Sequence, residues 1–421
     1  MLNILLLCNK PNLGHSANTV IDHIAAFEQY SRHRVWTLSC VGHFPKNLLL
    51  CHFDVVIIHY SLSLLNHYYL SRAAKEKIRQ FNGLKILFVQ DEYRAINRLI
   101  DEIHFLKMDV LFTCFPESEI NKIYPETVLP TISKYTNLTG YVPERLLKKT
   151  NLPKTAERSL HVGYRARKLP FWYGQLGFEK WNIVDQWHEK VSDPNLKVDI
   201  SYREQDRIYG DAWINFLSTC KTTLGVESGA SVMDFTGSLE QQVERYQLTH
   251  PTASFQDVQQ RFFKEEEGLY RLNQISPRCF EAIALKTALV LYEGEYSNVL
   301  KPWRHYIPLQ KDFSNIDAVL RAINNNELLE TMVETAYQEI ALNQTWHYKT
   351  WIEAVDHVIN REFCARKKQR THARYTEASY MKNISQISYF QRVFRKVLFA
   401  YYKLPASIRL VLRNVLSFTR Q

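Results

Sequence analysis

The sequence predicts an α/β fold made of two Rossmann-like domains and a basic, helical C-terminal tail. Short apolar runs of strand length alternate with helical patterns, and this alternation starts twice, near residue 3 and near residue 159. Basic residues concentrate after residue 365. A chain of 421 residues is also too long for one ordinary core. We therefore expect domains at 1–150 and 151–363 and a tail at 364–421.

Five apolar runs mark the strands expected in the first domain. They are Asn3–Leu7, Arg34–Leu38, Val55–His59, Lys85–Val89 and Val110–Thr113, with helical patterns between them. Asp91 and Glu92 follow the fourth run, and acids just past a parallel strand lie at the mouth of the ligand crevice. Either carboxylate can orient or deprotonate a hydroxyl group of a substrate, or can cap the next helix.

The second domain is expected to start after the polar segment 148–157, which is typical of a linker. Its expected strands are Ser159–Val162, Val198–Tyr202, Thr222–Val226 and Ala288–Tyr292, with a helix at Gly210–Cys220. Two glycines then flank Glu227 and Ser228, which lets backbone amides approach a ligand or simply form a tight turn. Residues 238–274 are charged and helical and are expected to be an insertion, with Ser254 and Asp257 spaced as a capping box.

The stretch 275–309 carries the strongest functional signal. Ser276 precedes Pro277 at the start of a helical pattern, where a missing N–H costs nothing. The free amides and the positive dipole end of a helix N-terminus suit a phosphate. Arg278 adds a charged donor there, and Glu281 can accept hydrogen bonds from sugar hydroxyl groups. The alternative is a buried α/β segment in which Glu281 is structural.

Residues of these types in this order resemble the donor-nucleotide site of glycosyltransferases with two Rossmann-like domains, the GT-B fold. The likeness is closest to enzymes of the group 1/4 type that share the phrases SPRxFEA and HYIPL, here Ser276–Ala282 and His305–Leu309. Asn273 stands where the family often has a second glutamate, and Lys286 stands where it favours glycine. The resemblance covers residues 158–320 well and the first domain only by pattern.

The resemblance also implies roles for particular residues. It assigns the donor ribose to Glu281, and it assigns the donor diphosphate to a basic pair after the first strand of the second domain. That pair is matched by Arg165 and Lys168, whose charges suit a departing diphosphate. In such enzymes the turn after the first strand faces the cleft, and Asn12 and His15 lie in that turn here. The predicted site residues are therefore Glu227, Asp91 and His15 as catalytic, Arg165, Lys168, Ser228, Gly229, Arg278 and Glu281 as donor-binding, and Asn12 and Glu92 as acceptor-binding.

The net charge of +10 belongs to the tail. From Arg366 to the end there are thirteen basic residues and one acid, a balance of +12, which leaves −2 for the preceding 365 residues. In the tail Phe390, Val393, Phe394, Val397 and Leu398 form an apolar stripe beside basic residues. Basic amphipathic helices with aromatic residues lie in membrane interfaces, so residues 366–421 are expected to bind an anionic membrane surface. Packing of these helices on the protein itself is the alternative.

Several classes of protein are disfavoured. The seven cysteines are scattered without the paired spacing of a zinc site or a disulfide framework, which favours a reducing compartment. No stretch approaches the roughly 20 apolar residues of a spanning helix. We expect a cytoplasmic protein, peripheral on the inner face of the membrane. No Asp-x-Asp element ends a strand, so we expect no metal and no cofactor besides the nucleotide sugar.

The expected function is transfer of a sugar from a nucleotide-sugar donor to a glycan, lipid-linked or other membrane-associated acceptor, as in the biosynthesis of cell-surface polysaccharides. A nucleotide-sugar epimerase on the same fold is a second interpretation and would not need the tail. A nucleic-acid-binding protein using the tail is a third. It is disfavoured because the apolar residues of the tail form stripes rather than dispersed stacking aromatics, and because the two domains are slightly acidic.

Overall fold

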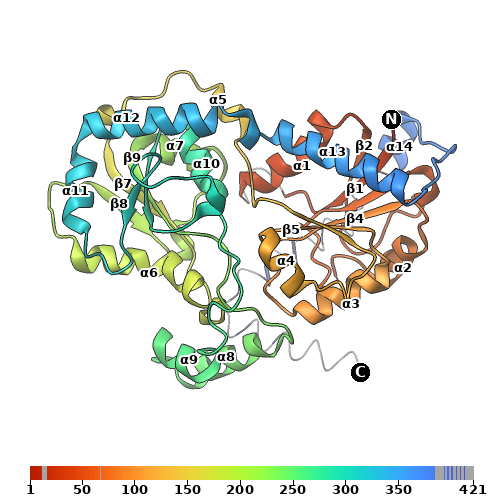
Figure 1. Cartoon of the computed structure of the whole chain (residues 1–421), viewed down its shortest axis with the longest axis horizontal. Helices are drawn as coiled ribbons and strands as arrows, with labels where there is room; N and C mark the ends of the chain where they lie inside the picture. Colours follow the sequence, from red (N-terminus) through yellow and green to blue (C-terminus); the bar gives the residue numbers. More distant parts are fainter. Residues whose placement is uncertain are drawn as a thin grey trace.

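The computed structural model consists of two α/β lobes, with the first domain on the right and the second on the left in Figure 1. It describes residues 1–11, 17–66 and 68–384 and, beyond these, only Val393, Lys396, Val397, Ala400, Tyr401, Leu404, Ile408 and Leu412. Each lobe contains one parallel sheet. The two sheets confirm the predicted class of two Rossmann-like domains.

The sheet of the first domain has six strands in the order β2-β1-β3-β4-β5-β6, and all neighbours are parallel. The strands are β1 Asn3–Cys8, β2 Arg34–Ser39, β3 Val55–Ile58, β4 Leu84–Phe88, β5 Val110–Thr113 and β6 Ser133–Thr136. The helices are α1 Asn18–Tyr30, α2 Arg72–Gln80, α3 Ile96–Leu106, α4 Glu117–Ile123 and α5 Glu144–Leu147, with the 3₁₀ turn η1 Leu50–His52. Strand β6 was not predicted because its sequence, SKYT, is polar and its residues are half-buried or exposed.

The sheet of the second domain has five parallel strands in the order β11-β10-β9-β7-β8. They are β7 Leu160–Arg165, β8 Val198–Ser201, β9 Cys220–Gly225, β10 Ala288–Tyr292 and β11 Ile307–Leu309, the last lying in the HYIPL phrase. The helices are α6 Gln175–Lys190, α7 Gly210–Thr219, α10 Pro277–Ala284, α11 Ile316–Asn324 and α12 Asn326–Ala336. Short turns of helix are η2 Thr155–Glu157, η3 Phe171–Tyr173, η4 Glu204–Asp206, η5 Tyr296–Asn298, η6 Tyr337–Ala341 and η7 Gln344–Trp346.

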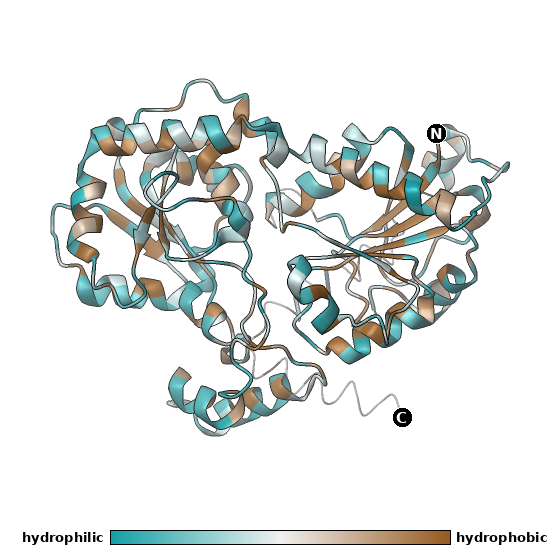
Figure 2. Cartoon of the chain, in the orientation of Figure 1, coloured by the Kyte–Doolittle hydropathy of each residue, from teal (hydrophilic) through white to brown (hydrophobic). Residues whose placement is uncertain are grey.

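The strands are nearly continuous apolar runs because helices cover both faces of each sheet. In β1 every residue is buried, with Leu5 and Leu7 in the core on one face and Ile4 and Leu6 in the core on the other. Figure 2 shows the strands as largely hydrophobic and the outer sides of the helices as largely hydrophilic. The two edges of each sheet where strands end are therefore the places left for polar loops.

Helix α13, Tyr348–Ala365, returns from the second domain and packs on the first, along the top of Figure 1. Its Trp351 lies against α1, with the ring centroid 5.2 Å from that of Phe27. The indole Nε1 donates to Asn137 Oδ1 at 2.7 Å.

An insertion from the second domain carries α8, Ser238–Thr249, and α9, Phe255–Phe262, at the bottom of Figure 1. The predicted capping box of Ser254 and Asp257 starts α9. The segment that leads into α8 pairs with the loop after β4 of the first domain. Residues 93–97 and 234–240, called here the interdomain clasp, form a parallel bridge in which Asp234 N donates to Tyr93 O at 2.9 Å and Ile96 N donates to Asp234 O at 3.2 Å.

The described start of the tail packs on the first domain. The Arg366 guanidinium donates to the carbonyls of Asp109 and Thr131, and Tyr380 of α14, Glu377–Asn383, is buried beside Trp36 of β2 at a ring distance of 4.7 Å. Most of the predicted apolar stripe lies outside the described residues, and its described members Val393 and Val397 are exposed. None of the helices in the described part of the chain is long and apolar enough to cross a membrane.

Candidate functional site

Asp91 lies at the carboxyl edge of the first sheet, three residues beyond the buried end of β4. Its side chain is exposed, and its backbone has a φ of 57°, in the left-handed region. The interdomain clasp begins at the second residue after Asp91, so the second domain holds this loop by backbone hydrogen bonds and by the ion pair of Arg94 with Glu240 at 2.7 Å. The predicted catalytic carboxylate of the first domain is therefore fixed at the interface between the two domains.

Lys180 of α6, in the second domain, lies close enough to Asp91 for their charges to interact. Burial lowers the pKa of its ammonium group to about 8, although the charge of Asp91 opposes that shift, and nearby Arg278 adds to it. No other described residue forms a hydrogen bond or ion pair with its Nζ, so this half-buried cation is available to an anion. Lys180 was not predicted, because a lysine on an amphipathic helix carries no local signal of a site.

Two predicted donor-binding cations, Arg278 and Lys168, keep exposed charges in the second domain. Arg278, in the first turn of α10, is exposed, stacks over Trp213 at 5.0 Å from the ring centroid and donates to the carbonyl of Arg165. Lys168 is exposed, and its Nζ lies 4.5 Å from the ring centroid of Trp181 on α6. Both side chains are held by aromatic rings and keep donors for a ligand. Arg278 acts on the pKa of Lys180, so these two cations of the second domain lie close together, whereas Lys168 contacts Trp181, the residue next to Lys180 in the chain.

Arg165, in contrast, is engaged inside the second domain. Its guanidinium donates to the carbonyls of Tyr164, Asp199 and Asp206 and forms an ion pair with the Asp199 carboxylate at 2.8 Å. These contacts tie the end of β7 to β8 and η4. Because a diphosphate would have to displace several of them, we correct the predicted role of Arg165 from donor binding to support of the sheet edge.

Glu281 is buried on α10, with 4% of its surface exposed. One carboxylate oxygen accepts a hydrogen bond from Trp213 Nε1 at 2.8 Å, and no other described residue donates to the second oxygen. Burial raises the pKa of the Glu281 carboxyl, against the lowering effects of the Trp213 hydrogen bond and of Arg278. The free oxygen beside Arg278 is the feature that the predicted ribose contact requires.

Glu227, predicted as catalytic, has a buried carboxylate with partners on both oxygens. One oxygen accepts from the backbone amides of Glu295 and Tyr296, at 3.0 and 2.8 Å, and the other accepts from Asn273 Nδ2 at 2.7 Å. A side chain at Gly294 would also collide with this carboxylate. Glu227 therefore joins the loops that follow β9 and β10, and we correct its role to a structural one.

Ser228 and Gly229 also have structural contacts, with the end of the insertion. Ser228 exchanges both backbone hydrogen bonds with Gln274, at 2.7 and 2.9 Å. Gly229 has a φ of 114°, and a Cβ built on it would lie 1.7 Å from the carbonyl oxygen of Leu272. This glycine is required by the close approach of the insertion, so the expected donor contact has no support in the local geometry.

The N-terminus of α6, a second place where a phosphate could bind, is already occupied by one side chain of the insertion and one of the loop after β9. Gln175 N donates to Glu267 Oε1 at 3.0 Å, and Leu176 N donates to Ser231 Oγ at 3.2 Å. Because these two groups satisfy the first free amides, an incoming phosphate would have to be met by the side chains of Lys168, Lys180 and Arg278 instead.

The acceptor-binding predictions concern Glu92 and Asn12. Glu92 is buried, and its carboxyl group accepts from Thr113 Oγ1, the Cys114 amide and the Tyr124 hydroxyl at 2.5–2.6 Å. Burial raises the pKa of Glu92 to about 7. Through these three contacts Glu92 holds the loop after β5, and its contact with an acceptor stays a prediction. Asn12 and His15 lie outside the described residues.

A pair of buried histidines lies at the carboxyl end of β3, with His59 directly after that strand and His23 on α1. His59 Nε2 and His23 Nδ1 are 2.9 Å apart, and His59 Nδ1 is 2.9 Å from Ser61 Oγ. The ring of Trp351 covers His23 at 4.1 Å between centroids. Burial lowers the pKa of both imidazoles, that of His59 to about 3, so both are neutral near pH 7.

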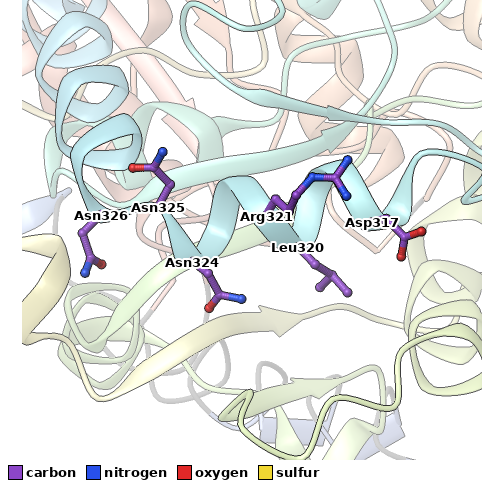
Figure 3. Close-up of a pocket in the computed structure, with 6 residues that line it drawn as sticks. All are labelled: Asp317, Leu320, Arg321, Asn324, Asn325 and Asn326. Carbon is purple, nitrogen blue, oxygen red and sulfur yellow. The ribbon is translucent and has the colours of Figure 1, made fainter.

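One surface hollow lies away from this interface. Asp317, Leu320 and Arg321 of α11 and Asn324, Asn325 and Asn326 at the start of α12 line it, as Figure 3 shows, at the outer edge of the second domain in Figure 1. Among the described residues no group of three or more His, Cys, Asp or Glu side chains has a metal-binding arrangement. The interface around Asp91 therefore remains the candidate site.

Comparison with known proteins finds a likeness in backbone structure and none in sequence. The sequence matches no protein-family model and no curated protein. Among solved structures, it is similar to an alpha-glucosyltransferase in complex with UDP-glucose and DNA (TM-score 0.48, 11% identity, 84% of this chain and 99% of that chain). It is also similar to an alpha1,3-fucosyltransferase (0.43, 10%, 85% and 90%) and to HepE of Anabaena with UDP-glucose (0.40, 10%, 87% and 100%). Likeness at this level does not identify a function.

Proposed function

We propose that this protein is a glycosyltransferase that moves a sugar from a nucleoside-diphosphate sugar to a hydroxyl group of a glycan or lipid-linked acceptor. One observation carries the proposal. The exposed carboxylate of Asp91, from the first domain, lies within electrostatic reach of the available ammonium group of Lys180 in the second, which itself lies close to Arg278. A base on one side and cations on the other are the groups that glycosyl transfer to a hydroxyl requires.

The proposed reaction assigns one task to each side. The bond between the anomeric carbon and the diphosphate oxygen breaks, and a bond from that carbon to the acceptor oxygen forms. Asp91 takes up the proton of the acceptor hydroxyl group. Lys180 and Arg278 stabilise the charge that grows on the departing diphosphate, which makes their effect largest in the transition state. Lys168 adds an exposed charge in the same domain.

The nucleotide end of the donor is assigned to α10. The second oxygen of Glu281 accepts a hydrogen bond from a ribose hydroxyl group, and Arg278, one turn earlier on the same helix, reaches the diphosphate. Because these side chains can neutralise the diphosphate, the proposal includes transfer without a metal ion or other cofactor.

The tail motivates the proposal that the acceptor is membrane-associated. Its described start, residues 366–384, is anchored on the first domain, the same domain that presents Asp91. Seven basic residues and no acid lie between Arg392 and Arg420. Each basic residue near an anionic membrane surface contributes on the order of 1 kcal/mol to the free energy of binding, and less at high salt.

Removal of residues 385–421 is expected to abolish salt-sensitive sedimentation with anionic liposomes while nucleotide binding persists. Unchanged sedimentation would contradict the membrane proposal.

The function is tested by calorimetry with UDP, GDP, CDP, ADP and dTDP and the matching nucleosides. We expect one nucleoside diphosphate to bind far more tightly than its nucleoside. Lys180→Met is expected to weaken that diphosphate by about 10- to 100-fold, the effect of losing a charged hydrogen bond, and to leave nucleoside binding unchanged. Lys190→Met removes an exposed lysine from the last turn of the same helix and serves as the matched control.

The outcomes separate the alternatives. No binding of any nucleoside diphosphate would overturn the proposal, as would a Lys180→Met variant with unchanged affinity. An epimerase would convert its nucleotide sugar to an isomer without an acceptor, which product chromatography detects. Salt-sensitive binding of RNA by the full chain, with no nucleotide preference, would favour the nucleic-acid interpretation.

A further inference from the structure

The loop that carries Asp91 has an unfavourable backbone conformation. Asp91 and Ala95 have φ values of 57° and 44°, in the left-handed region that residues other than glycine rarely adopt. A residue in this region costs free energy and persists only where the surrounding structure holds it in place. Ala95 is also the residue before α3, and it has no side-chain group that could cap the free amides at the start of that helix. Contacts from elsewhere in the chain have to hold this loop.

The second domain supplies these contacts through the interdomain clasp. The first amide of α3, Ile96 N, donates to the carbonyl of Asp234. The second, Asn97 N, donates to the carbonyl of Phe235 at 3.0 Å. On the other side of Ala95, the carbonyl of Tyr93 accepts from Asp234 N. The segment before α8 therefore caps a helix of the first domain with its own backbone and holds the loop at both ends of residues 93–97.

The side chain of Asp234 fixes this segment. Asp234 is buried, and its two carboxylate oxygens accept from Gly237 N at 2.7 Å and from Glu240 N at 3.2 Å. These bonds close the turn that carries the carbonyls of Asp234 and Phe235. The turn also lies tightly against the loop, since a Cβ built on Gly237 would lie 3.1 Å from the Cβ of Ala95. Loss of the Asp234 carboxylate would release the groups that hold the loop.

The same segment also holds the helix that carries Lys180. Ser231 N donates to the carbonyl of Tyr173 at 3.1 Å, and Ser231 Oγ accepts from Leu176 N in the first turn of α6. Asp234 follows Ser231 by three residues. One short segment is thus bonded both to the start of the helix with the proposed cation and to the loop with the proposed base, so it sets the spacing between them.

We propose that the interdomain clasp positions Asp91 for catalysis and that Asp234 is the positioning residue. This inference rests on the proposed function and adds to it the residue on which the placement of the base depends. Asp234 itself does not touch the substrate, because its carboxylate is buried and bonded to backbone amides. Its loss shifts Asp91, and a shift of about 1 Å at a reacting group can lower turnover about 100-fold.

Hydrogen exchange of the full chain tests the clasp without a substrate. Asp234→Ala is expected to speed exchange about tenfold or more in the peptide 93–99, which contains the amides of Ile96 and Asn97, and to leave β10 unchanged. Asp257→Ala is the matched control. Asp257 also accepts a backbone amide, that of Ser254, but at the start of α9 and outside the clasp. This control should keep the exchange of the wild type at 93–99.

Turnover tests the consequence for the chemistry. It is measured as release of the nucleoside diphosphate that binds from its glucose or mannose ester, with methyl glycosides and water as acceptors. Asp234→Ala should lower kcat about 10- to 100-fold while the affinity for the nucleoside diphosphate stays within about twofold. In an Asp91→Asn background the same substitution should lower kcat no further, because its effect passes through Asp91. A merely structural role would lower kcat by the same factor in both backgrounds.

The outcomes separate the inference from the function on which it rests. Unchanged exchange at 93–99, unchanged kcat, or an equal loss of kcat in both backgrounds would overturn Asp234 as a positioning residue. If urea unfolding shows that Asp234→Ala does not fold, Glu240→Ala removes the ion pair with Arg94, keeps the buried turn and enters the same comparisons. A wild type that binds no nucleoside diphosphate, or releases none from its sugar esters, would instead overturn the proposed function.

Discussion

Acidification below pH 6.5 should destabilise the first domain through its buried histidine pair. An unfolded histidine titrates near pH 6.5, whereas burial lowers the pKa of folded His59 to about 3. Between these values the unfolded chain binds a proton that the folded chain does not, so the free energy of unfolding falls as the pH falls. At about 1.36 kcal/mol per pH unit, His59 alone costs about 2 kcal/mol at pH 5. His23 acts in the same direction, because burial and then His59 lower its pKa.

Glu92 has the opposite effect and has to be separated from the histidines. Burial raises the pKa of Glu92 to about 7, above its ordinary value of 4.5. Between those values the folded chain binds a proton that the unfolded chain does not, so acidification stabilises the folded state through this group. The pH dependence of the wild type alone therefore mixes two signs. A comparison with a variant that lacks one histidine cancels the contribution of Glu92.

The assay is urea unfolding followed by tryptophan fluorescence at pH 7 and pH 5. Between these conditions we expect the wild type to lose about 2 kcal/mol more stability than His59→Gln, whose amide does not titrate. His104→Gln, at an exposed position of α3, is the control and should lose as much as the wild type. Equal losses for the wild type and His59→Gln would refute the reasoning, because His59 would then titrate alike in the folded and unfolded chains.

Three substitutions test the site assignments. Asp91→Asn should lower kcat by about 10²- to 10⁴-fold, the usual contribution of a general base, with donor affinity from calorimetry unchanged; unchanged kcat would remove Asp91 from the chemistry. Glu281→Gln should weaken binding of the nucleoside diphosphate by about 1–3 kcal/mol, and equal affinity in a folded variant would assign the ribose elsewhere. Arg165→Met should lower the urea midpoint, because it leaves several carbonyls without a donor, while nucleotide affinity stays within about twofold. Lost affinity without lost stability would restore Arg165 to the donor site.

The fold was predictable where burial dictates composition. Parallel strands covered on both faces must be apolar along their whole length, and β1, β3, β5 and β10 are such runs. Strand β6 has the polar sequence SKYT, and β11 has only three residues. Neither has an apolar run long enough to stand out from a loop, so neither was found.

The site was only partly predictable because partners across domains leave no local pattern. The positions of Asp91 and Arg278 follow from the end of a strand and the start of a helix, both readable in sequence. Arg165 and Glu227 also lie at or just after the end of a strand. The Arg165 guanidinium, however, pairs with Asp199, and the Glu227 carboxylate accepts a hydrogen bond from the amide of Tyr296. Lys180 was missed because its role depends on the loop of the other domain.

The return of the chain to its first domain sets an order of folding during synthesis. Helix α13 is made after the whole of the second domain, yet it covers the face of the first domain on which α1 carries His23 and Phe27. Until α13 leaves the ribosome, this aromatic face has no cover and the first domain cannot complete its core. The second domain lies between the first domain and helix α13 in the chain, so the whole second domain leaves the ribosome before α13 does. The domain that begins translation is thus the one that finishes folding last, and chains released before residue 348 present an uncovered apolar face to chaperones and to one another.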